Sequence, residues 1–410
     1  MNTHRTALLA ATLACATVLA ACGRPDPAAG GDTSTPHGYV EGAQEQAEAQ
    51  NRLVYAAVDG DRPRMLDLAS EKTQPLGPRR DERVQDLTGD GRFVYVAPES
   101  DAGVRVLDSG VWTVEHGDHH HYYTAVPAAL GAVRGQAPGS VAGSAAGAAV
   151  VFEGDGEVAV LSREALDDGE LDLSARVDVG PHAGVAVPYR EHVVVSTASS
   201  TGRLADGVEV VGVDGKRVQA LDVACPDLRG HAVARTGVLF GCADGLLLVT
   251  EGDGVFDAEK IGYPAGTSAA DRATSLHVRP GSNAVAASGD GGVWVVDPSA
   301  RTARLIATEQ PPVAVASPGD DRSVLVLRRD GVLEARSVTD GQVLASRPVL
   351  SGPVDPAAGP APVIEVDLAR AYVNDAAGDR IVEIDHADDL RVARTLATEV
   401  TPHFMTEVGR

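Results

Sequence analysis

The sequence predicts an all-β protein, a β-propeller with eight blades. Short apolar strands recur along the chain, Asp-Gly or Gly-Gly turns separate many of them, and the pattern returns about every 40 to 56 residues. Such turns between β-branched runs are strong hairpin signals. The period is that of propeller blades rather than of β-sandwiches. No segment shows sustained helical periodicity, which excludes a mainly helical fold.

The first 21 residues have the pattern of a secretory signal peptide. A basic start precedes a short apolar run, which ends at Leu19-Ala20-Ala21-Cys22-Gly23 and so resembles a bacterial lipobox. The run is shorter than the roughly 20 apolar residues of a spanning helix. We expect removal of residues 1–21, lipidation of Cys22 and an extracytoplasmic protein anchored to the cell membrane. The alternative is a plain secreted protein in which Cys22 has no such role.

Residues 22–51 are predicted to form a flexible tether. They are rich in Pro, Gly, Ala, Glu and Gln and contain almost no large apolar residues, so they cannot bury enough surface to fold alone. His37 and Glu41 lie in this segment. They are candidates for an accessory metal site, although solvated side chains are the simpler interpretation.

Residues 52–410 are predicted to form the propeller domain. Eight hairpins recur in it, at residues 52–68, 92–108, 149–161, 192–213, 237–249, 283–297, 323–338 and 371–385. A further apolar strand, the expected innermost one, precedes most of them. The first hairpin has no such strand before it, and residues 403–408 can supply it, which closes the ring by pairing the chain ends and removes an exposed edge. Seven blades remain the alternative if one hairpin is an insertion, and residues 122–148 are the most irregular stretch.

Charge and motifs restrict the function. The formal net charge is −23, which argues against nucleic acid and anionic surfaces as partners. The chain contains no G-x-S-x-G elbow, HExxH helix or Walker A loop. We therefore expect a binding protein rather than an enzyme.

Two cysteines remain in the predicted mature domain. Cys15 leaves with the signal peptide and Cys22 is the predicted lipidation site, so Cys225 and Cys242 form an even pair in an oxidising compartment. A disulfide is the first expectation there, and two buried free thiols are the alternative.

The candidate metal-binding segment, called the histidine stretch below, is His116-Gly117-Asp118-His119-His120-His121-Tyr122-Tyr123. Imidazole and carboxylate groups are typical Zn²⁺ ligands. In an extended strand His119 and His121 point to one face and His120 to the other, so the H-x-H pair can bind one metal ion. The alternative is a polar loop in which the histidines are solvated.

Other histidines lie near the starts of predicted innermost strands. His182, His231 and His403 have this position, and such starts gather at one mouth of a propeller channel. We expect His182 and His231 to meet the histidine stretch there and to complete a tetrahedral set. For His403 the simpler interpretation is a strand cap. His277 lies in the middle of a predicted strand, and its simpler interpretation is a core or channel residue.

Several motifs together resemble the AztD-type zinc metallochaperones, which are extracytoplasmic propellers associated with zinc ABC importers. The resemblance spans nearly the whole mature chain, from His37-Gly38-Tyr39-Val40-Glu41-Gly42-Ala43 to the C-terminus. Its motifs are the histidine stretch, Gly180-Pro181-His182, Cys225-Pro226-x-Leu228-x-Gly230, Phe240-Gly241-Cys242-x-Asp244-Gly245 and residues 362–367. The resemblance implies that His119, His121 and His182 bind zinc, with His116 and Asp118 as ligands or as supporting residues. Arg229 departs from the family pattern, which has histidine there, so that either His231 substitutes or one ligand is missing.

The resulting hypothesis is a lipid-anchored zinc chaperone that passes Zn²⁺ by ligand exchange to the solute-binding protein of a zinc ABC importer. We expect a monomer with no nucleic-acid partner. A lactonase-like propeller hydrolase that uses a channel metal, and a non-catalytic scaffold of the cell envelope, are the alternatives.

Overall fold

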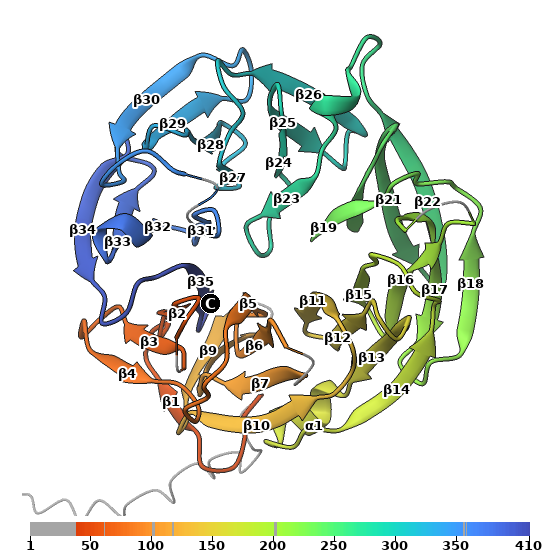
Figure 1. Ribbon diagram of the computed structural model, residues 1–410, viewed down its shortest axis with the longest axis horizontal. Helices are drawn as coiled ribbons and strands as arrows, with labels where there is room; N and C mark the ends of the chain where they lie inside the picture. Colours follow the sequence, from red (N-terminus) through yellow and green to blue (C-terminus); the bar gives the residue numbers. More distant parts are fainter. Residues whose placement is uncertain are drawn as a thin grey trace, which may run out of the picture. The chain divides into compact units, whose positions relative to one another are not determined.

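Eight four-stranded antiparallel sheets form the body of the described chain. The computed structural model describes residues 38–60, 62–100, 103–116, 119–200, 203–355, 357 and 359–410, without the side chain of His116. These residues belong to a compact unit that spans residues 37–410. Figure 1 shows the sheets around a ring, with the first strand of each blade innermost and the fourth at the periphery.

The first four blades follow one another along the chain. From the inside outward, their strands are β35 (Phe404–Val408), β2 (Arg52–Ala56), β3 (Arg64–Asp67) and β4 (Thr73–Pro75) in blade one; β5 (Val84–Gly89), β6 (Phe93–Pro98), β7 (Val104–Asp108) and β10 (Ala128–Val133) in blade two; β11 (Pro138–Ser144), β12 (Gly147–Phe152), β13 (Glu157–Leu161) and β14 (Leu173–Asp178) in blade three; and β15 (Ala186–Tyr189), β16 (His192–Ala198), β17 (Ala205–Gly212) and β18 (Arg217–Leu221) in blade four.

The remaining blades repeat the same order. They consist of β19 (Arg229–Val233), β20 (Val238–Cys242), β21 (Gly245–Gly252) and β22 (Val255–Gly262); β23 (Ser275–Val278), β24 (Val285–Gly289), β25 (Gly292–Asp297) and β26 (Thr302–Ala307); β27 (Ala314–Ala316), β28 (Ser323–Leu327), β29 (Val332–Ser337) and β30 (Val343–Pro348); and β31 (Ile364–Val366), β32 (Ala371–Asp375), β33 (Arg380–Asp385) and β34 (Arg391–Ala397). Among the described residues, the connections contain one short helix, α1 (Arg163–Asp167), and two 3₁₀ turns, at Ala269–Asp271 and Ala376–Gly378.

Each blade is apolar on both faces because it packs between two neighbours. In β16, Val193 and Val195 join the cluster shared with blade three, whereas Val194 points the other way, into the cluster shared with blade five. Side chains alternate along a strand, so a continuous apolar run serves both interfaces. Eight clusters of this kind lie between successive blades. Full burial of each such valine contributes about 1.5–3 kcal/mol.

The two ends of the propeller domain pair with each other. β2 runs antiparallel to β35, in register from Arg52 opposite Val408 to Ala56 opposite Phe404. The last cluster joins Leu53 and Tyr55 of blade one to Tyr372 of blade eight. The predicted eight-bladed propeller is therefore confirmed, and the alternative of seven blades is excluded.

The predicted tether is described from residue 38 onward, and this part contains a strand. Gln44–Gln46 forms β1, which pairs with β9 (His119–Thr124), and the carbonyl oxygen of Gly38 accepts a hydrogen bond of 3.1 Å from Trp112 Nε1. Residues 1–37, including Cys22 and His37, lie outside the described residues. In the described chain no helix is long and apolar enough to span a membrane.

Candidate metal centre

The histidine stretch forms a hairpin inserted into blade two. β8 (Val111–His116) and β9 pair with each other and lie in the connection between β7 and β10, the third and fourth strands of that blade. Gly110 begins the insertion with φ of +68°, and a Cβ atom there would come within 2.4 Å of the carbonyl oxygen of Ala125. Glycine is therefore required where the hairpin leaves the blade.

The register of the hairpin arranges its side chains. Val114 lies opposite His121 and Trp112 opposite Tyr123. Because side chains alternate, His119 and His121 share one face and His120 lies on the other. The backbone register also sets His116 opposite His119. Gly117, Asp118 and the side chain of His116 lie outside the described residues, so the roles of His116 and Asp118 stay predictions.

His119 and His121 are close enough to bind one ion. Their Nε2 atoms lie 3.0 Å apart. Two imidazole nitrogens bound to one tetrahedral Zn²⁺ at 2.0–2.1 Å would lie roughly 3.3 Å apart, so a small ring rotation would admit the ion. The donor chemistry and the spacing therefore fit zinc. Among the described residues, no group of three His, Cys, Asp or Glu side chains is arranged to hold a metal ion. The His119–His121 pair supplies at most two of the four ligands of a tetrahedral site.

Glu45 is a third polar group at this pair, and the sequence analysis missed it. Its Oε1 atom lies 2.7 Å from Nδ1 of His121. β1 brings it there, since Glu45 pairs with Tyr123 and its side chain reaches the next residue on the same face of β9. The sequence Gln44-Glu45-Gln46 has no apolar alternation, so nothing in it predicts a strand.

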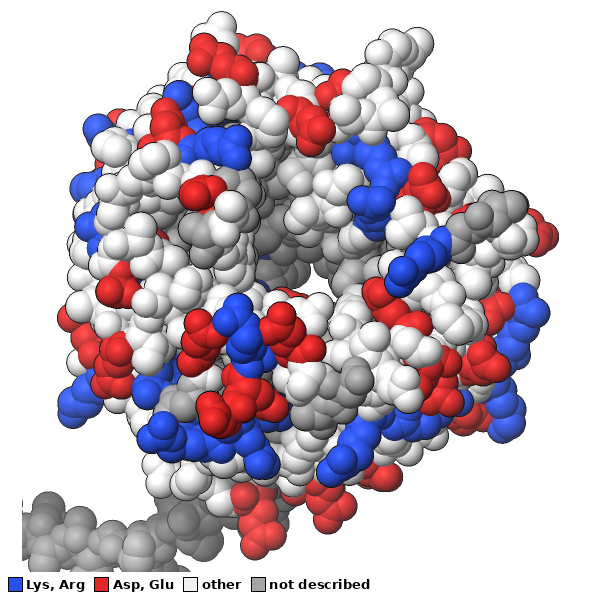
Figure 2. Space-filling model, viewed as in Figure 1, with Lys and Arg blue, Asp and Glu red and all other residues white. Residues whose placement is uncertain are grey.

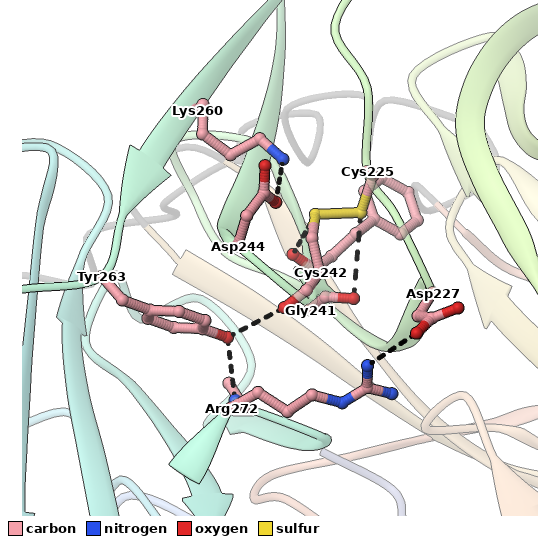
Figure 3. The surroundings of a disulfide bond; sticks show 10 residues. Cys225, Asp227, Gly241, Cys242, Asp244, Lys260, Tyr263 and Arg272 are labelled. Atoms are coloured by element: carbon pink, nitrogen blue, oxygen red, sulfur yellow. Dashed lines mark hydrogen bonds and ion pairs between the residues drawn. A yellow bond between two sulfur atoms is a disulfide. The ribbon is translucent and has the colours of Figure 1, made fainter. Parts of the chain in front are cut away.

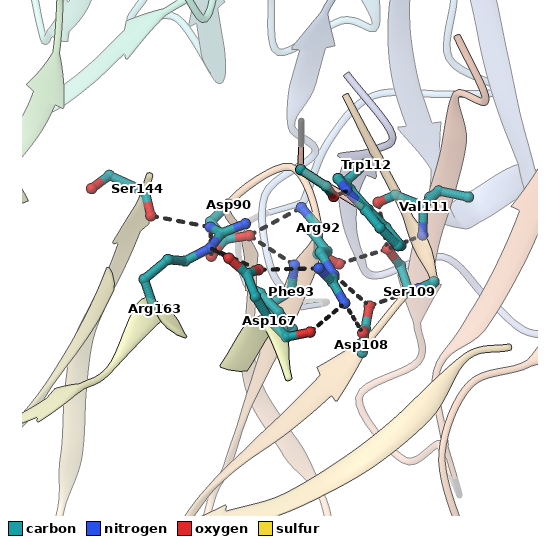
Figure 4. Close-up of polar contacts among 12 residues, drawn as sticks. Asp90, Arg92, Phe93, Asp108, Ser109, Val111, Trp112, Ser144, Arg163 and Asp167 are labelled. Carbon is teal, nitrogen blue, oxygen red and sulfur yellow. Dashed lines mark hydrogen bonds and ion pairs between the residues drawn. The ribbon is translucent and has the colours of Figure 1, made fainter. Parts of the chain in front are cut away.

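A buried polar network holds the base of the hairpin (Figure 4). The guanidinium of Arg92 makes two hydrogen bonds to Asp108, of 3.2 and 2.8 Å, and a third of 3.0 Å to Asp167 at the end of α1. The same group lies over the ring of Trp112. Arg92 thus connects blade two, the helix of blade three and the beginning of β8.

His182 lies in a different environment. It is buried, its Nδ1 atom lies 2.8 Å from the carbonyl oxygen of Gly180, and its Nε2 atom lies 2.8 Å from Oγ of Ser196. Both ring nitrogens therefore have partners within the protein. Binding a metal through His182 would require one of these hydrogen bonds to be given up.

The strand directions also separate His182 from the hairpin, contrary to the expectation of one shared channel mouth. In four consecutive antiparallel strands, the first-to-second and third-to-fourth connections lie at one edge of the blade, and the links between blades lie at the other. The hairpin occupies a third-to-fourth connection, whereas His182 precedes β15, the first strand of blade four. Thr113 of the hairpin accordingly bonds Gly409, just past the end of the innermost strand β35.

The other histidines are distributed along the innermost strands. Burial lowers the pKa of His231, on β19, to about 4. Burial and then the positive charge of Arg410 lower the pKa of His277, on β23, to about 4, and the backbone N–H of Ser317 donates to its Nδ1. Nδ1 of His403 accepts from the backbone N–H of Val58, as a strand cap would. His231 lies in blade five, whereas the His119–His121 pair lies in the hairpin inserted into blade two, and a role of His231 as a ligand stays a prediction.

Cys225 and Cys242 form a disulfide, with a sulfur–sulfur distance of 2.03 Å (Figure 3). Both residues are fully buried. The bond ties the segment before β19 to the end of β20, and Tyr263 donates a hydrogen bond to the carbonyl oxygen of Cys242. Both sulfurs are therefore removed from the list of metal ligands.

Fold and site together define the class: an eight-bladed β-propeller with an inserted hairpin that carries a histidine pair. A comparison with protein-family models finds no match. Among curated proteins, the chain is 26% identical over 330 residues to the zinc chaperone AztD of Citrobacter koseri. The aligned residues cover 78% of this chain and 77% of the relative. The resemblance to AztD-type proteins that the motifs indicate is thereby confirmed.

Solved structures agree with this assignment of the fold. The crystal structure of Citrobacter koseri AztD superposes with a TM-score of 0.75 at 24% identity, covering 88% of this chain and 98% of that one. The structure of apo AztD from the same organism gives a TM-score of 0.74 at 23% identity, with the same coverage. At this level of identity the two structures show the fold alone. The curated relative is named as a chaperone rather than as an enzyme.

Proposed function

We propose that this protein is a zinc metallochaperone that holds Zn²⁺ at the β8–β9 hairpin and passes it to an acceptor outside the cytoplasm. The observation that carries the proposal is the 3.0 Å approach of the His119 and His121 Nε2 atoms, on a chain similar to a zinc chaperone. Zinc is the cargo here rather than a structural element, because the propeller already has a buried core between every two blades.

The exposure of the pair suits transfer. His119 is exposed and His121 is partly exposed, so the ligands of an acceptor can approach the ion while it is still bound. Ligand exchange then replaces these imidazoles one at a time, and the metal never becomes free. The formal net charge of −23 raises the local concentration of cations. On the face that Figure 2 presents, acidic and basic side chains are intermixed.

The acceptor and the location are inferred from sequence motifs. We take the acceptor to be the solute-binding protein of a zinc ABC importer, and the chaperone to be a monomer anchored to the cell membrane through lipid on Cys22. Both parts rest on the lipobox-like motif and on the resemblance to AztD-type proteins. Mass spectrometry of protein extracted from membranes would detect the diacylated Cys22, and a soluble, unmodified N-terminus would contradict the anchor.

Zinc binding by variants of the hairpin tests the central claim. Competition with a chromogenic chelator should show strong loss of affinity in the His119→Ala/His121→Ala double variant. His120→Ala is the matched control, since His120 lies on the opposite face of the same strand. Transfer to the purified solute-binding protein in the presence of excess chelator should fail in the same double variant. Equal affinity in the double variant and the control would reject the hairpin as the zinc site.

The dependence of binding on pH gives a second check. Each ligand imidazole must be neutral to bind, so zinc affinity should be clearly lower at pH 5.5 than at pH 7.5. Equal affinity at the two values would contradict a site made of histidines.

A further inference from the structure

The carboxylate beside the histidine pair comes from a distant part of the chain. Glu45 lies on β1, ahead of the propeller strands, and its Oε1 atom lies 2.7 Å from Nδ1 of His121. β1 buries no apolar side chain, and Gln44 and Glu45 are exposed. Gln46 adds a hydrogen bond of 3.0 Å from its Nε2 to Oγ1 of Thr124. The strand therefore sets a charged acceptor beside β9 without contributing to the core.

A carboxylate at this place determines the state of the imidazole. An ionised carboxylate can only accept hydrogen bonds, so Nδ1 of His121 must carry the proton that is shared with Glu45. In a neutral imidazole the other nitrogen then carries the lone pair that can bind a metal, and which nitrogen binds is set by the hydrogen bond of the other. In His121 that other nitrogen is Nε2, the atom that faces His119.

We infer that Glu45 is a positioning residue for zinc: its carboxylate holds His121 in the Nδ1–H tautomer and aims Nε2 at the ion shared with His119. This inference rests on the proposed function and deepens it. Carboxylates that bond metal-bound histidines fix ring orientation and raise the basicity of the ligand, and their loss typically lowers metal affinity about 10- to 100-fold. Glu45 touches the ring rather than the ion.

The neighbouring contacts fix the same segment on the same face of the hairpin. Tyr39 packs edge-on against Tyr123, with ring centroids 6.5 Å apart. A Cβ atom on Gly38 would come within 2.4 Å of the Val114 side chain, so only glycine allows this approach. Val114 lies opposite His121 in the register. The segment from Gly38 to Gln46 thus holds the carboxylate in place from both ends.

The test uses the full mature chain and reads the tautomer directly. Long-range ¹H–¹⁵N correlation spectra of the zinc-free protein at pH 7.5 should show His121 protonated at Nδ1. Glu45→Ala should shift it toward a mixture of tautomers and lower zinc affinity about 10- to 100-fold. Glu45→Gln, which keeps a neutral acceptor, should give a smaller loss. Glu48→Gln, an exposed position that follows β1, is the matched control and should leave both readouts unchanged.

The outcomes separate this inference from the proposed function. An Nε2–H tautomer in the parent protein, or a Glu45→Ala variant with unchanged tautomer and unchanged zinc affinity, would overturn the positioning role. Loss of zinc binding in the Glu48→Gln control equal to that in Glu45→Ala would do the same. A parent protein that shows the Nδ1–H tautomer but binds no zinc would refute the proposed function while leaving the Glu45–His121 hydrogen bond established.

Discussion

The guanidinium carbon of Arg92 lies 3.9 Å from the centre of the Trp112 ring. A cation over an aromatic face is attracted by the ring quadrupole, the more so when it is shielded from water. Arg92 is 4% exposed and its partner Asp108 is 8% exposed. This contact is where the buried core of blade two meets the hairpin that carries the histidines, so the stability of the blade and the placement of the hairpin depend on one side chain.

Replacement of Arg92 should therefore destabilise the protein strongly. Arg92→Ala leaves the carboxylate of Asp108 buried without its cation, and removal of one partner of a buried ion pair costs about 3–5 kcal/mol. Urea-induced unfolding followed by circular dichroism would measure the loss. Arg83→Ala is the control, because its ion pairs with Asp59 and Glu99 are exposed and such pairs are worth about 0–1 kcal/mol. Similar losses in the two variants would contradict a structural role for the buried network.

The disulfide should contribute to stability through the chain segment that it closes. Cys225 and Cys242 are 17 residues apart, and closing a loop of this length is worth about 3 kcal/mol. The double variant Cys225→Ala/Cys242→Ala should lose about that much unfolding free energy and bind zinc as before. Reduction of the parent protein should produce a comparable loss, whereas the double variant should not respond to the reductant. A parent protein insensitive to reduction would show that the bond adds nothing.

Much of the fold could be predicted because its determinants are local. β-branched runs such as residues 193–195 and turns such as Asp244-Gly245 carry their signal within a few residues, and the period of the hairpins gives the number of blades. The closing pair β2–β35 follows from one missing inner strand before the first hairpin and one additional strand at the C-terminal end of the pattern. The alternation of His119, His120 and His121 needs only an extended backbone.

The site was harder to predict because it depends on pairing over a distance. Strand β1 places Glu45 next to His121, and the polar sequence of β1 does not predict a strand. His182 is separated from the hairpin because the hairpin lies in the connection between β7 and β10, and only the structure identifies these two strands. β10, with the sequence Ala-Ala-Leu-Gly-Ala-Val, is too weakly β-branched to be recognised as the fourth strand of blade two. Without β10, the edge of the blade at which the hairpin leaves cannot be determined.

Glu407 should make the stability of the propeller depend on pH. It is fully buried at the end of β35, and desolvation raises its pKa from 4.5 to about 8, although Arg410 at 2.9 Å opposes the shift. The native protein therefore keeps this carboxyl protonated at pH values where the unfolded chain releases the proton. The contribution of this protonated carboxyl to the free energy of unfolding is complete below about pH 4.5 and is lost as the pH rises toward 8.

Glu407→Gln keeps a neutral side chain of the same shape and should remove this dependence. The difference in unfolding free energy between variant and parent should grow in favour of the variant from pH 5 to pH 8, as measured by urea unfolding at each pH. Glu399, whose exposed carboxylate pairs with Arg64, gives the control, and Glu399→Gln should show no comparable trend. Parallel pH profiles for the parent and Glu407→Gln would show that Glu407 ionises normally in the folded protein.

Substitution of His182 should separate stability from zinc binding at the hairpin. His182→Ala leaves the Gly180 carbonyl without its side-chain partner, removes one of the two hydrogen bonds of the Ser196 hydroxyl and opens a cavity. A buried polar group left unpaired costs about 1–3 kcal/mol. Ser196→Ala keeps the contact of His182 with Gly180 but removes the hydroxyl that bonds both His182 Nε2 and the backbone N–H of Val185, so it should also destabilise the protein. Both variants should keep the zinc affinity of the parent, because the strand directions set His182 at the other edge of the blades from His119 and His121. A loss of zinc affinity in His182→Ala as large as in the His119→Ala/His121→Ala variant, in a protein that remains folded, would instead place His182 in the same site.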